Sequence, residues 1–472
     1  MKKTLNLDIV GVSQAMRNYS MRASKLFPSS SIARTQVNGA CFRCQLASTA
    51  SLRSILAQPY HHNPTRRKQS TWAQAVSVAS NVFSNSISRA TSGGGESIDP
   101  LRMVAKEMKF LTGNIRQLLG SGHPSLDTVA KYYTQAEGKH VRPMIVLLMS
   151  RATTSSPKSP RYNPNQEITD IDNPISPTTI LSDVNPTAPT LNPLAHVPRT
   201  YSAAESDILP SQRRLAEITE LIHTASLLHD DVIDHSVSRR GSPSANLEFG
   251  NKMAVLAGDF LLSRASVALA RLRDAEVTEL LATVIANLVE GEFMQLKNTA
   301  QDEKNPVWSE ETISYYLQKT YLKSASLISK SCRAAALLGG SDAVTVDAAY
   351  DYGKNLGLAF QLVDDMLDYT ISEKELGKPA GADLELGLAT APLIFAWKNN
   401  KELGSLVGRK FSREGDVLRA RELVLQSDGL EQTRALAEEY ASRAISAISS
   451  FPESEAKDGL IEMADKTLKR RK

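Results

Sequence analysis

Residues 227–241 read LLHDDVIDHSVSRRG, and this stretch dominates the interpretation of the chain. Three carboxylates, Asp230, Asp231 and Asp234, stand among apolar residues there. On an α-helix Asp230 and Asp234 lie about 40° apart on one face, one turn apart along the axis. Because a buried charge without a partner is costly, the segment requires a cation. Paired oxygen ligands suit Mg²⁺, which keeps several waters and shares its coordination with phosphate groups.

The same spacing returns 134 positions downstream, where residues 360–370 read FQLVDDMLDYT. Asp364, Asp365 and Asp368 again lie between apolar residues. One motif of this kind is equally well explained by a solvated acidic turn. Its recurrence instead predicts two buried helices that face one another across a cavity and hold several Mg²⁺ ions.

Basic residues accompany both motifs. Lys and Arg together with Mg²⁺ form the usual cradle for diphosphate groups. Each cation alone would be explained as a surface charge, but the set as a whole predicts a diphosphate substrate, and more than one of them. The set comprises Lys139, His140 and Arg142 in GKHVRP, Arg239 and Arg240 after the first motif, Lys319 beside Thr320, and Lys378 after the second motif.

Three histidines near the first motif raise the alternative of a histidine metal site. His223, His229 and His235 follow one another at six-residue intervals, which turns each about 120° from the last. They therefore share no helix face, and a three-histidine site is rejected. For His223 two readings stay open, a phosphate contact and a buried core histidine.

Helical signals dominate the chain after residue 95. Asp99 as N-cap, Pro100 in the first turn and Gly120 as a stop predict one helix over 99–120. Strict two-residue alternation is almost absent, so the predicted fold class is an all-α bundle. Further helices are expected at about 211–235, 251–273, 275–298, 309–338, 343–369, 388–399, 415–427 and 430–449.

One segment has a different composition from the predicted bundle. Residues 152–208 contain nine of the 21 prolines and are rich in Ser, Thr and Asn, a composition that buries too little surface to order itself. We expect a disordered insertion within a single domain at 96–472.

The N-terminal region, residues 1–95, carries 12 Lys or Arg and a single acid, Asp8. This acid-poor, Ser-rich composition predicts an organelle-import presequence; the alternative is a disordered tail without an address. The rest of the chain has 43 basic and 50 acidic residues, and its lack of a basic stripe argues against nucleic acid as a partner. No segment is expected to span a bilayer, and the three cysteines lack the second pair that a zinc site requires.

The motifs taken together resemble those of the trans-polyprenyl diphosphate synthases. GKHVRP, HDDVIDHSVSRRG, AGDFLL, GEFMQL, KTYLKSASL and FQLVDDMLDY…GKPAGADLELGLATAP occur in the family's order, over roughly 98–472 without the insertion. Within the family the chain is most similar to the mitochondrial synthases that make the ubiquinone side chain. The resemblance implies an isoprenoid synthase-type bundle around a central cavity. It also implies a homodimer, with a heteromer as the alternative, in the matrix or on the matrix face of the inner membrane.

The resemblance further implies a 1'-4 condensation of isopentenyl diphosphate with an allylic diphosphate primer. Three Mg²⁺ ions would be held by Asp230 and Asp234, with Asp231 in support, and by Asp364, Asp365 and Asp368. Ala225 and Ser226, both small, would allow a long product. Isopentenyl diphosphate would be bound by Lys139, Arg142, His223 and Arg240, and the allylic diphosphate by Arg239, Lys319, Thr320, Gln361 and Lys378.

Two departures from the family pattern are visible. GGKRxRP is replaced by EGKHVRP, with Glu137 and His140 in place of a glycine and a basic residue, and GKxT is replaced by GLAT, with Leu388 in place of a lysine. Neither change removes a metal ligand, so an active enzyme is expected. The alternatives are a class I terpene cyclase, which would lack the second diphosphate pocket, and a non-catalytic partner subunit, which would have lost aspartates.

Overall fold

The structure is a computed structural model of the chain. The described residues are 99–121, 123–135, 140–159, 207–239, 241–296, 306–370 and 381–470. The expected presequence, as well as Lys139, Arg240 and Lys378, lies outside them.

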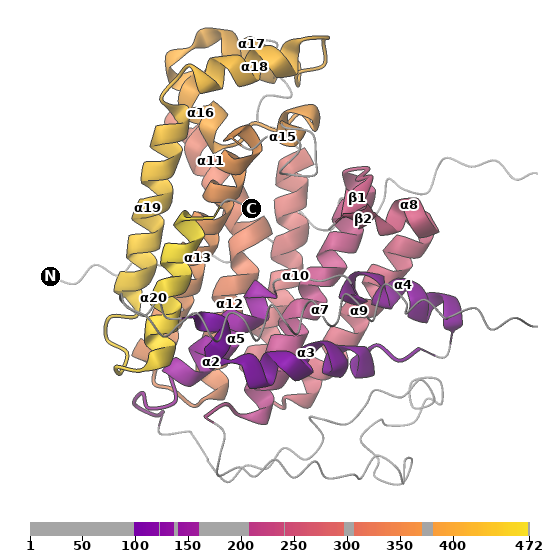
Figure 1. Cartoon of the computed structure of the whole chain (residues 1–472), viewed down its shortest axis with the longest axis vertical. Helices are drawn as coiled ribbons and strands as arrows, with labels where there is room; N and C mark the ends of the chain where they lie inside the picture. The colour runs from indigo at the N-terminus through magenta and orange to yellow at the C-terminus, as the bar shows by residue number, and fades with distance from the viewer. Residues whose placement is uncertain are drawn as a thin grey trace, which may run out of the picture. The chain divides into compact units, whose positions relative to one another are not determined.

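The described part is almost entirely helical, as predicted (Figure 1). Its first half comprises α2 (Pro100–Met103), α3 (Ala105–Leu118), α4 (Pro124–Gln135), α5 (Val141–Ala152), α7 (Pro210–Ile233), α8 (Ala245–Phe249), α9 (Asn251–Arg271) and α10 (Ala275–Leu296). Its second half comprises α11 (Glu310–Thr320), the π-helix η1 (Tyr321–Ala325), α12 (Ser326–Leu338), α13 (Ala343–Thr370), α15 (Ala382–Glu385), α16 (Ala391–Asn399), α17 (Lys401–Gly408), α18 (Asp416–Leu425), α19 (Gly429–Ala447) and α20 (Glu455–Leu468). Two short antiparallel strands, β1 (Ser238–Arg239) and β2 (Ser242–Pro243), follow α7.

The two helices that carry the aspartate motifs lie inside the bundle. α7 packs against α5, α9 and α12, and α13 packs against α12, α19 and η1. α7 is buried on nearly every side: Leu215, Ile218, Leu221 and Leu228 have no exposed surface, and Arg214, Glu217 and Glu220 are buried as well. The core therefore holds both motifs in place through the helices on which they stand.

Three helix predictions required correction. The Asp99 cap is confirmed, since its carboxylate accepts the N–H of Leu101 at 3.2 Å, but the expected single helix is broken at Val104 between α2 and α3. The helix expected over 309–338 contains the π-helical turn η1, and the one expected at 388–399 starts three residues later.

The start of the expected insertion is part of the folded unit. Ser159 N donates to Gly340 O at 2.8 Å, and Asp342 N donates to Pro157 O at 2.9 Å. These bonds join residues 157–159 to the turn between α12 and α13, although the sequence analysis began the insertion at 152. Residues 160–206 lie outside the described residues, so their disorder stays a prediction.

α9 has the length and composition of a membrane span, with a mean hydropathy of 1.5, contrary to the expectation that no segment would. It lies within the bundle, where Ala257, Leu261 and Ala265 have no exposed surface. One side of α9 therefore packs in the core, whereas Val255 and Leu256 on its outer side are exposed.

Candidate active site

The first aspartate motif stands at the C-terminal end of α7. Asp231 is fully buried and accepts hydrogen bonds from Tyr133 Oη and from the guanidinium of Arg239, whose Nε lies 3.1 Å from Oδ1. Tyr133 Oη in turn accepts the N–H of Ala245 at 2.8 Å. Asp231 therefore holds Arg239 in place, and its expected support of the metal ligands stays a prediction.

Asp230 and Asp234 are only partly buried. Burial raises the pKa of Asp230 to about 6, and the neighbouring charges of Glu292 and Asp234 add to this while Lys323 opposes it. Burial also raises the pKa of Asp234. Two carboxylates that resist ionisation side by side form a site that a divalent cation would stabilise.

Lys323 and Glu292 complete the first cluster, and the sequence analysis missed both. They form an ion pair with Nζ to Oε2 at 2.6 Å. The helices that carry them come close because residue 291 is glycine: a Cβ there would lie 2.8 Å from the backbone nitrogen of Lys323. Their signal was present in GEFMQL and KTYLKSASL, but Lys319 was singled out in the second of these and Lys323, one turn later, was not.

The second motif has a similar centre. Asp365 is buried and accepts hydrogen bonds from Tyr316 Oη at 2.6 Å and from Gln361 Nε2 at 2.8 Å. The Gln361 carbonyl accepts the hydroxyl of Ser324 at 2.8 Å. Gln361 was expected to bind the allylic diphosphate; in the structure it links Asp365 to η1.

The outer aspartates of the second motif have different neighbours. Asp364 pairs with Arg470 at 2.9 Å; burial raises its pKa to about 6, against the opposing charges of Arg470 and Arg142. The carboxylate of Asp368 accepts the N–H of Asp383 at 3.2 Å. Asp368 therefore also positions the start of α15.

Two of the four residues expected to bind isopentenyl diphosphate, Arg142 on α5 and His223 on α7, lie beside one another, whereas Lys139 and Arg240 lie outside the described residues. Arg142 Nη1 lies 2.9 Å from His223 Nε2, and His140 Nδ1 lies 3.0 Å from Glu220 Oε1. Burial alone would raise the pKa of Glu220. The hydrogen bond from His140 and the charges of His223 and Arg142 outweigh burial and lower this pKa to about 2. His223 thus positions Arg142, whose charge also acts on Asp364, as the electrostatics of that carboxyl show.

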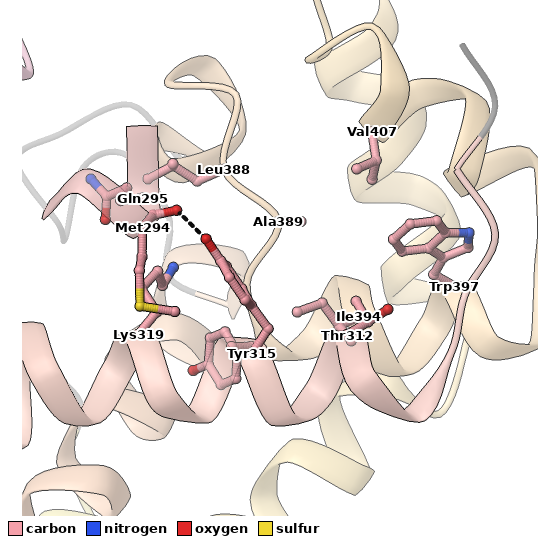
Figure 2. A pocket seen from close by; sticks show the side chains of 11 residues that line it. Met294, Gln295, Thr312, Tyr315, Lys319, Leu388, Ala389, Ile394, Trp397 and Val407 are labelled. Atoms are coloured by element: carbon pink, nitrogen blue, oxygen red, sulfur yellow. Dashed lines mark hydrogen bonds between the residues drawn. The ribbon is translucent and has the colours of Figure 1, made fainter. Parts of the chain in front are cut away.

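Lys319 lines a pocket beside the second motif (Figure 2). Its ammonium lies 5.4 Å from the centre of the Tyr316 ring, and burial lowers its pKa while the charge of Asp365 opposes that effect. Leu388, where the family has a lysine, lines the same pocket. Thr320 is buried and hydrogen-bonded to Tyr316, so it faces the core. The full lining is Met294, Gln295, Thr312, Tyr315, Tyr316, Lys319, Leu388, Ala389, Ile394, Trp397 and Val407.

Lys319 and Lys323 interact electrostatically with the two motifs. The charge of Lys323 acts on Asp230 and Asp234, whereas the charge of Lys319 acts on Asp365. The two lysines are also close enough for their charges to interact. Both motifs therefore border one charged region on α11 and η1.

Ala225 and Ser226 occupy the α7 turn before the first motif. Ala225 has no exposed surface, and the hydroxyl of Ser226 donates to the carbonyl of His223 at 2.9 Å. At these two positions α7 therefore carries small side chains, although Leu221, Ile222 and Leu228 nearby are bulky and buried. Their predicted influence on product length stays a prediction.

The carboxylates fit Mg²⁺ that is shared with a substrate. No group of three Asp, Glu, His or Cys side chains within the described ranges is arranged to hold an ion alone. Mg²⁺ commonly binds through one or two carboxylates, with substrate phosphate and water completing the octahedron. Asp230 with Asp234 on α7, and Asp364 on α13, match that donor set.

An all-helical bundle with two such carboxylate clusters and surrounding lysines and arginines defines a Mg²⁺-dependent enzyme that acts on diphosphate esters. Residues 193–424 match the family model described as polyprenyl synthetase. The Neurospora crassa protein named "Probable hexaprenyl pyrophosphate synthase, mitochondrial" is 72% identical over 94% of this chain and 98% of its own length. The chain belongs to the polyprenyl synthetase family and is a prenyltransferase.

Other relatives agree with this assignment. The mitochondrial hexaprenyl pyrophosphate synthase of Saccharomyces cerevisiae is 47% identical over 79% of this chain and 91% of its own length. The crystal structure of a polyprenyl synthase from Caulobacter crescentus, complexed with calcium and isoprenyl diphosphate, superposes with a TM-score of 0.63 at 30% identity. It covers 81% of this chain and 100% of that one. The predicted all-α isoprenoid synthase fold is confirmed.

Proposed function

We propose that this protein is a long-chain all-trans-polyprenyl diphosphate synthase that supplies the ubiquinone side chain. The observation that carries the proposal is the pair of aspartate motifs with buried, hydrogen-bonded centres and outer carboxylates beside Lys323, Lys319 and Arg142. All six aspartates are present, which a silent partner subunit would not need. Arg142 and its partner His223 offer the second diphosphate pocket that a terpene cyclase would lack.

In this proposal Asp230, Asp234, Asp364 and Asp368 hold three Mg²⁺ ions. When bound, these ions neutralise the charge that develops on the leaving diphosphate. Arg239, held in place by Asp231, and the two lysines of α11 and η1 bind the allylic diphosphate together with Lys378. Because Arg239, Lys319 and Lys323 are already oriented by the fold, they would stabilise the departing group without reorganising.

The second substrate would lie on the α5–α7 side. Arg142, positioned by His223, binds isopentenyl diphosphate together with Lys139 and Arg240. The allylic carbon–oxygen bond breaks, the isopentenyl double bond forms the new carbon–carbon bond with the resulting cation, and a proton is lost to the departing diphosphate. No enzymatic nucleophile is required.

The proposal includes a homodimer. Apolar side chains on the outer faces of α9 and α10 are strongly exposed, which a second copy would cover. They are Val255 at 39%, Leu256 at 57%, Val289 at 53%, Phe293 at 64% and Leu296 at 54%. Sedimentation of the purified chain would distinguish a dimer from a monomer that awaits a different subunit.

We also propose that the protein works in the mitochondrial matrix or on the matrix face of the inner membrane, with residues 1–95 as import signal. Relatives that carry "mitochondrial" in their names support this location. A fusion of residues 1–95 to a fluorescent protein should enter mitochondria, and a cytosolic fusion would contradict the proposal.

The deciding experiment for the reaction is direct. Purified protein is incubated with labelled isopentenyl diphosphate, an allylic primer and Mg²⁺, and the dephosphorylated products are separated by chromatography. We expect labelled chains of roughly C30 to C50. A product formed from the primer alone would indicate a cyclase, and the absence of turnover would indicate a silent subunit.

A further inference from the structure

The exposed charged side chains on the outward side of α3 are all basic. Its exposed residues are Ala105, Lys106, Lys109, Phe110, Gly113 and Arg116, so among the described side chains it presents three cations and no carboxylate. α2 adds exposed Arg102 and Leu101, the latter 44% exposed. We call the surface formed by Leu101, Arg102, Lys106, Lys109, Phe110 and Arg116 the basic face.

The basic face differs from an ordinary solvated helix. On α19 the exposed charges alternate in sign, with Glu431 and Glu438 beside Arg434 and Arg443. On α3 the acid Glu107 is half-buried, while Leu111 and Ile115 are buried. The sequence analysis found no basic stripe in this mildly acidic body, because the stripe arises only when α3 packs and selects which residues face outward.

An aromatic side chain stands within this charge. Phe110 is 55% exposed, and the ammonium of Lys109 lies 6.0 Å from its ring centre. Cations that surround an exposed Phe and Leu match an anionic lipid surface, where the cations meet phosphate groups and the apolar side chains enter the acyl boundary. A nucleic acid would use the charges but would leave Leu101 in water.

The position of α3 in the bundle matches the path of a polyprenyl product. Asn114 Nδ2 donates to Glu217 Oε1 at 2.8 Å, which places α3 across α7 at a point 13 residues before Asp230. That separation is about 20 Å of helix, and Figure 1 shows α3 at the end of the bundle away from β1 and β2. A product held by its diphosphate at the aspartates would extend its tail toward this end.

We propose that the basic face docks the enzyme on an anionic membrane surface, with the tail end of the product site toward the lipid. The choice of orientation rests on the proposed function. The docking itself rests on the charge, exposure and aromatic character of α2 and α3. The occupant we infer is an anionic phospholipid bilayer.

Vesicle flotation of the full chain tests this surface. Wild type and Lys106→Glu/Lys109→Glu are floated with phosphatidylcholine vesicles that contain about one-fifth cardiolipin, and with phosphatidylcholine alone. Each basic residue near an anionic surface strengthens membrane binding by somewhat less than about tenfold. Reversing two of these charges should therefore reduce partitioning more than tenfold. Phe110→Ser should reduce it less, and pure phosphatidylcholine should bind wild type weakly.

A matched control accounts for the basic N-terminal region, which every variant retains. Lys401→Glu/Arg434→Glu reverses two exposed cations on α17 and α19 and should change flotation less than twofold. Equal losses in both double variants, or none in either, would overturn the proposal. So would a change of oligomeric state in Lys106→Glu/Lys109→Glu without lipid, because the face would then be a protein interface.

Flotation requires no turnover, so the two proposals fail separately. A chain that floats as expected but makes no polyprenyl diphosphate refutes the proposed function and leaves the docking surface. A chain that makes the product but whose α3 variants float like wild type refutes the docking surface alone.

Discussion

The two aspartate motifs share their spacing and their centres but differ in their surroundings. Asp231 and Asp365, the middle residues, are both buried and both accept a tyrosine hydroxyl. Asp230 and Asp364, the first residues, both have a pKa raised to about 6 by burial. Both motifs thus have the same arrangement: the central carboxylate is buried and hydrogen-bonded, and the outer carboxylates are left for the proposed Mg²⁺.

The cations beside the first residues differ. Asp230 is next to Lys323, and Lys323 is held by its ion pair with Glu292 on α10. Asp364 is paired with Arg470, two residues after the end of α20, whose guanidinium lies 4.0 Å from the centre of the Phe360 ring. The first motif is therefore built into the bundle, and the second is completed by the end of the chain.

The largest expected effect tests whether the first residues are equivalent. Asp230→Ala and Asp364→Ala should each remove at least about 3 kcal/mol of transition-state stabilisation, because each takes a ligand from a metal that neutralises the leaving diphosphate. Turnover measured with isopentenyl diphosphate and primer checks this, with circular dichroism as the control for folding. Near-normal activity in one variant would break the equivalence.

The middle residues should act on stability. Asp231→Ala leaves Arg239 and Tyr133 without their buried partner, and we expect a loss of about 3 kcal/mol in the free energy of unfolding. Asp365→Ala removes hydrogen bonds from Tyr316 and Gln361 and should lose about 1–3 kcal/mol. Urea denaturation measures both. A larger loss at Asp365 would mean that its interactions outweigh the Asp231–Arg239 ion pair.

The two lysines should separate in their kinetics. Lys323→Met should raise the KM for the allylic substrate by about tenfold to a hundredfold, since a charge-assisted contact contributes about 1.5–3 kcal/mol. Lys319→Met should have a smaller effect, because the charge of Lys319 acts on the buried centre Asp365, whereas that of Lys323 acts on Asp230 and Asp234. Glu292→Gln is the control that keeps Lys323 but frees it from its ion pair. The reverse order would favour Lys319, the residue chosen from the sequence, as the main contact of the allylic diphosphate.

The raised pKa values predict a pH dependence that metal should cancel. The folded state binds protons at Asp230 and Asp364 that the unfolded state has released between pH about 4 and about 6, so stability should fall as pH rises through this window. After allowance for solvent screening we expect about 1 kcal/mol per carboxyl. The melting temperature is measured at pH 5 and 7.5 with and without Mg²⁺. Mg²⁺ should stabilise more at pH 7.5, and Asp230→Asn/Asp364→Asn should lose the difference.

The smallest energetic effect concerns the turns that precede the motifs. Five and four residues before Asp230 stand Ala225 and Ser226, whereas the same places before Asp364 hold Ala359 and Phe360. A growing tail should therefore pass beside α7. Ala225→Phe should shorten the products to about C15–C20 while primer binding is retained, because each added isoprene unit buries apolar surface only where space exists. An unchanged long-chain profile would place the tunnel elsewhere.

Local patterns were sufficient for the fold class, most of the long helices and the two motifs, whereas α4, α5, α17 and α20 were not predicted. Helical periodicity and capping act within a few residues, so Asp99 and Pro100 predict a helix start without any tertiary contact. The carboxylate spacing in LLHDDVIDH is likewise a property of one helix. The break at Val104 and the π-helical turn η1 were not predicted, because both depend on neighbouring helices.

Tertiary packing decided which residue does what within the site. Spacing alone cannot show that Asp231 is committed to Tyr133 and Arg239, 98 positions and 8 positions away. Nor can it pair Lys323 with Glu292, since that contact exists only because Gly291 lets two helices approach. The charge of the α3 surface has the same origin. A sequence lists charges in order, and only packing determines which of them share a face, a partner or a low-dielectric environment.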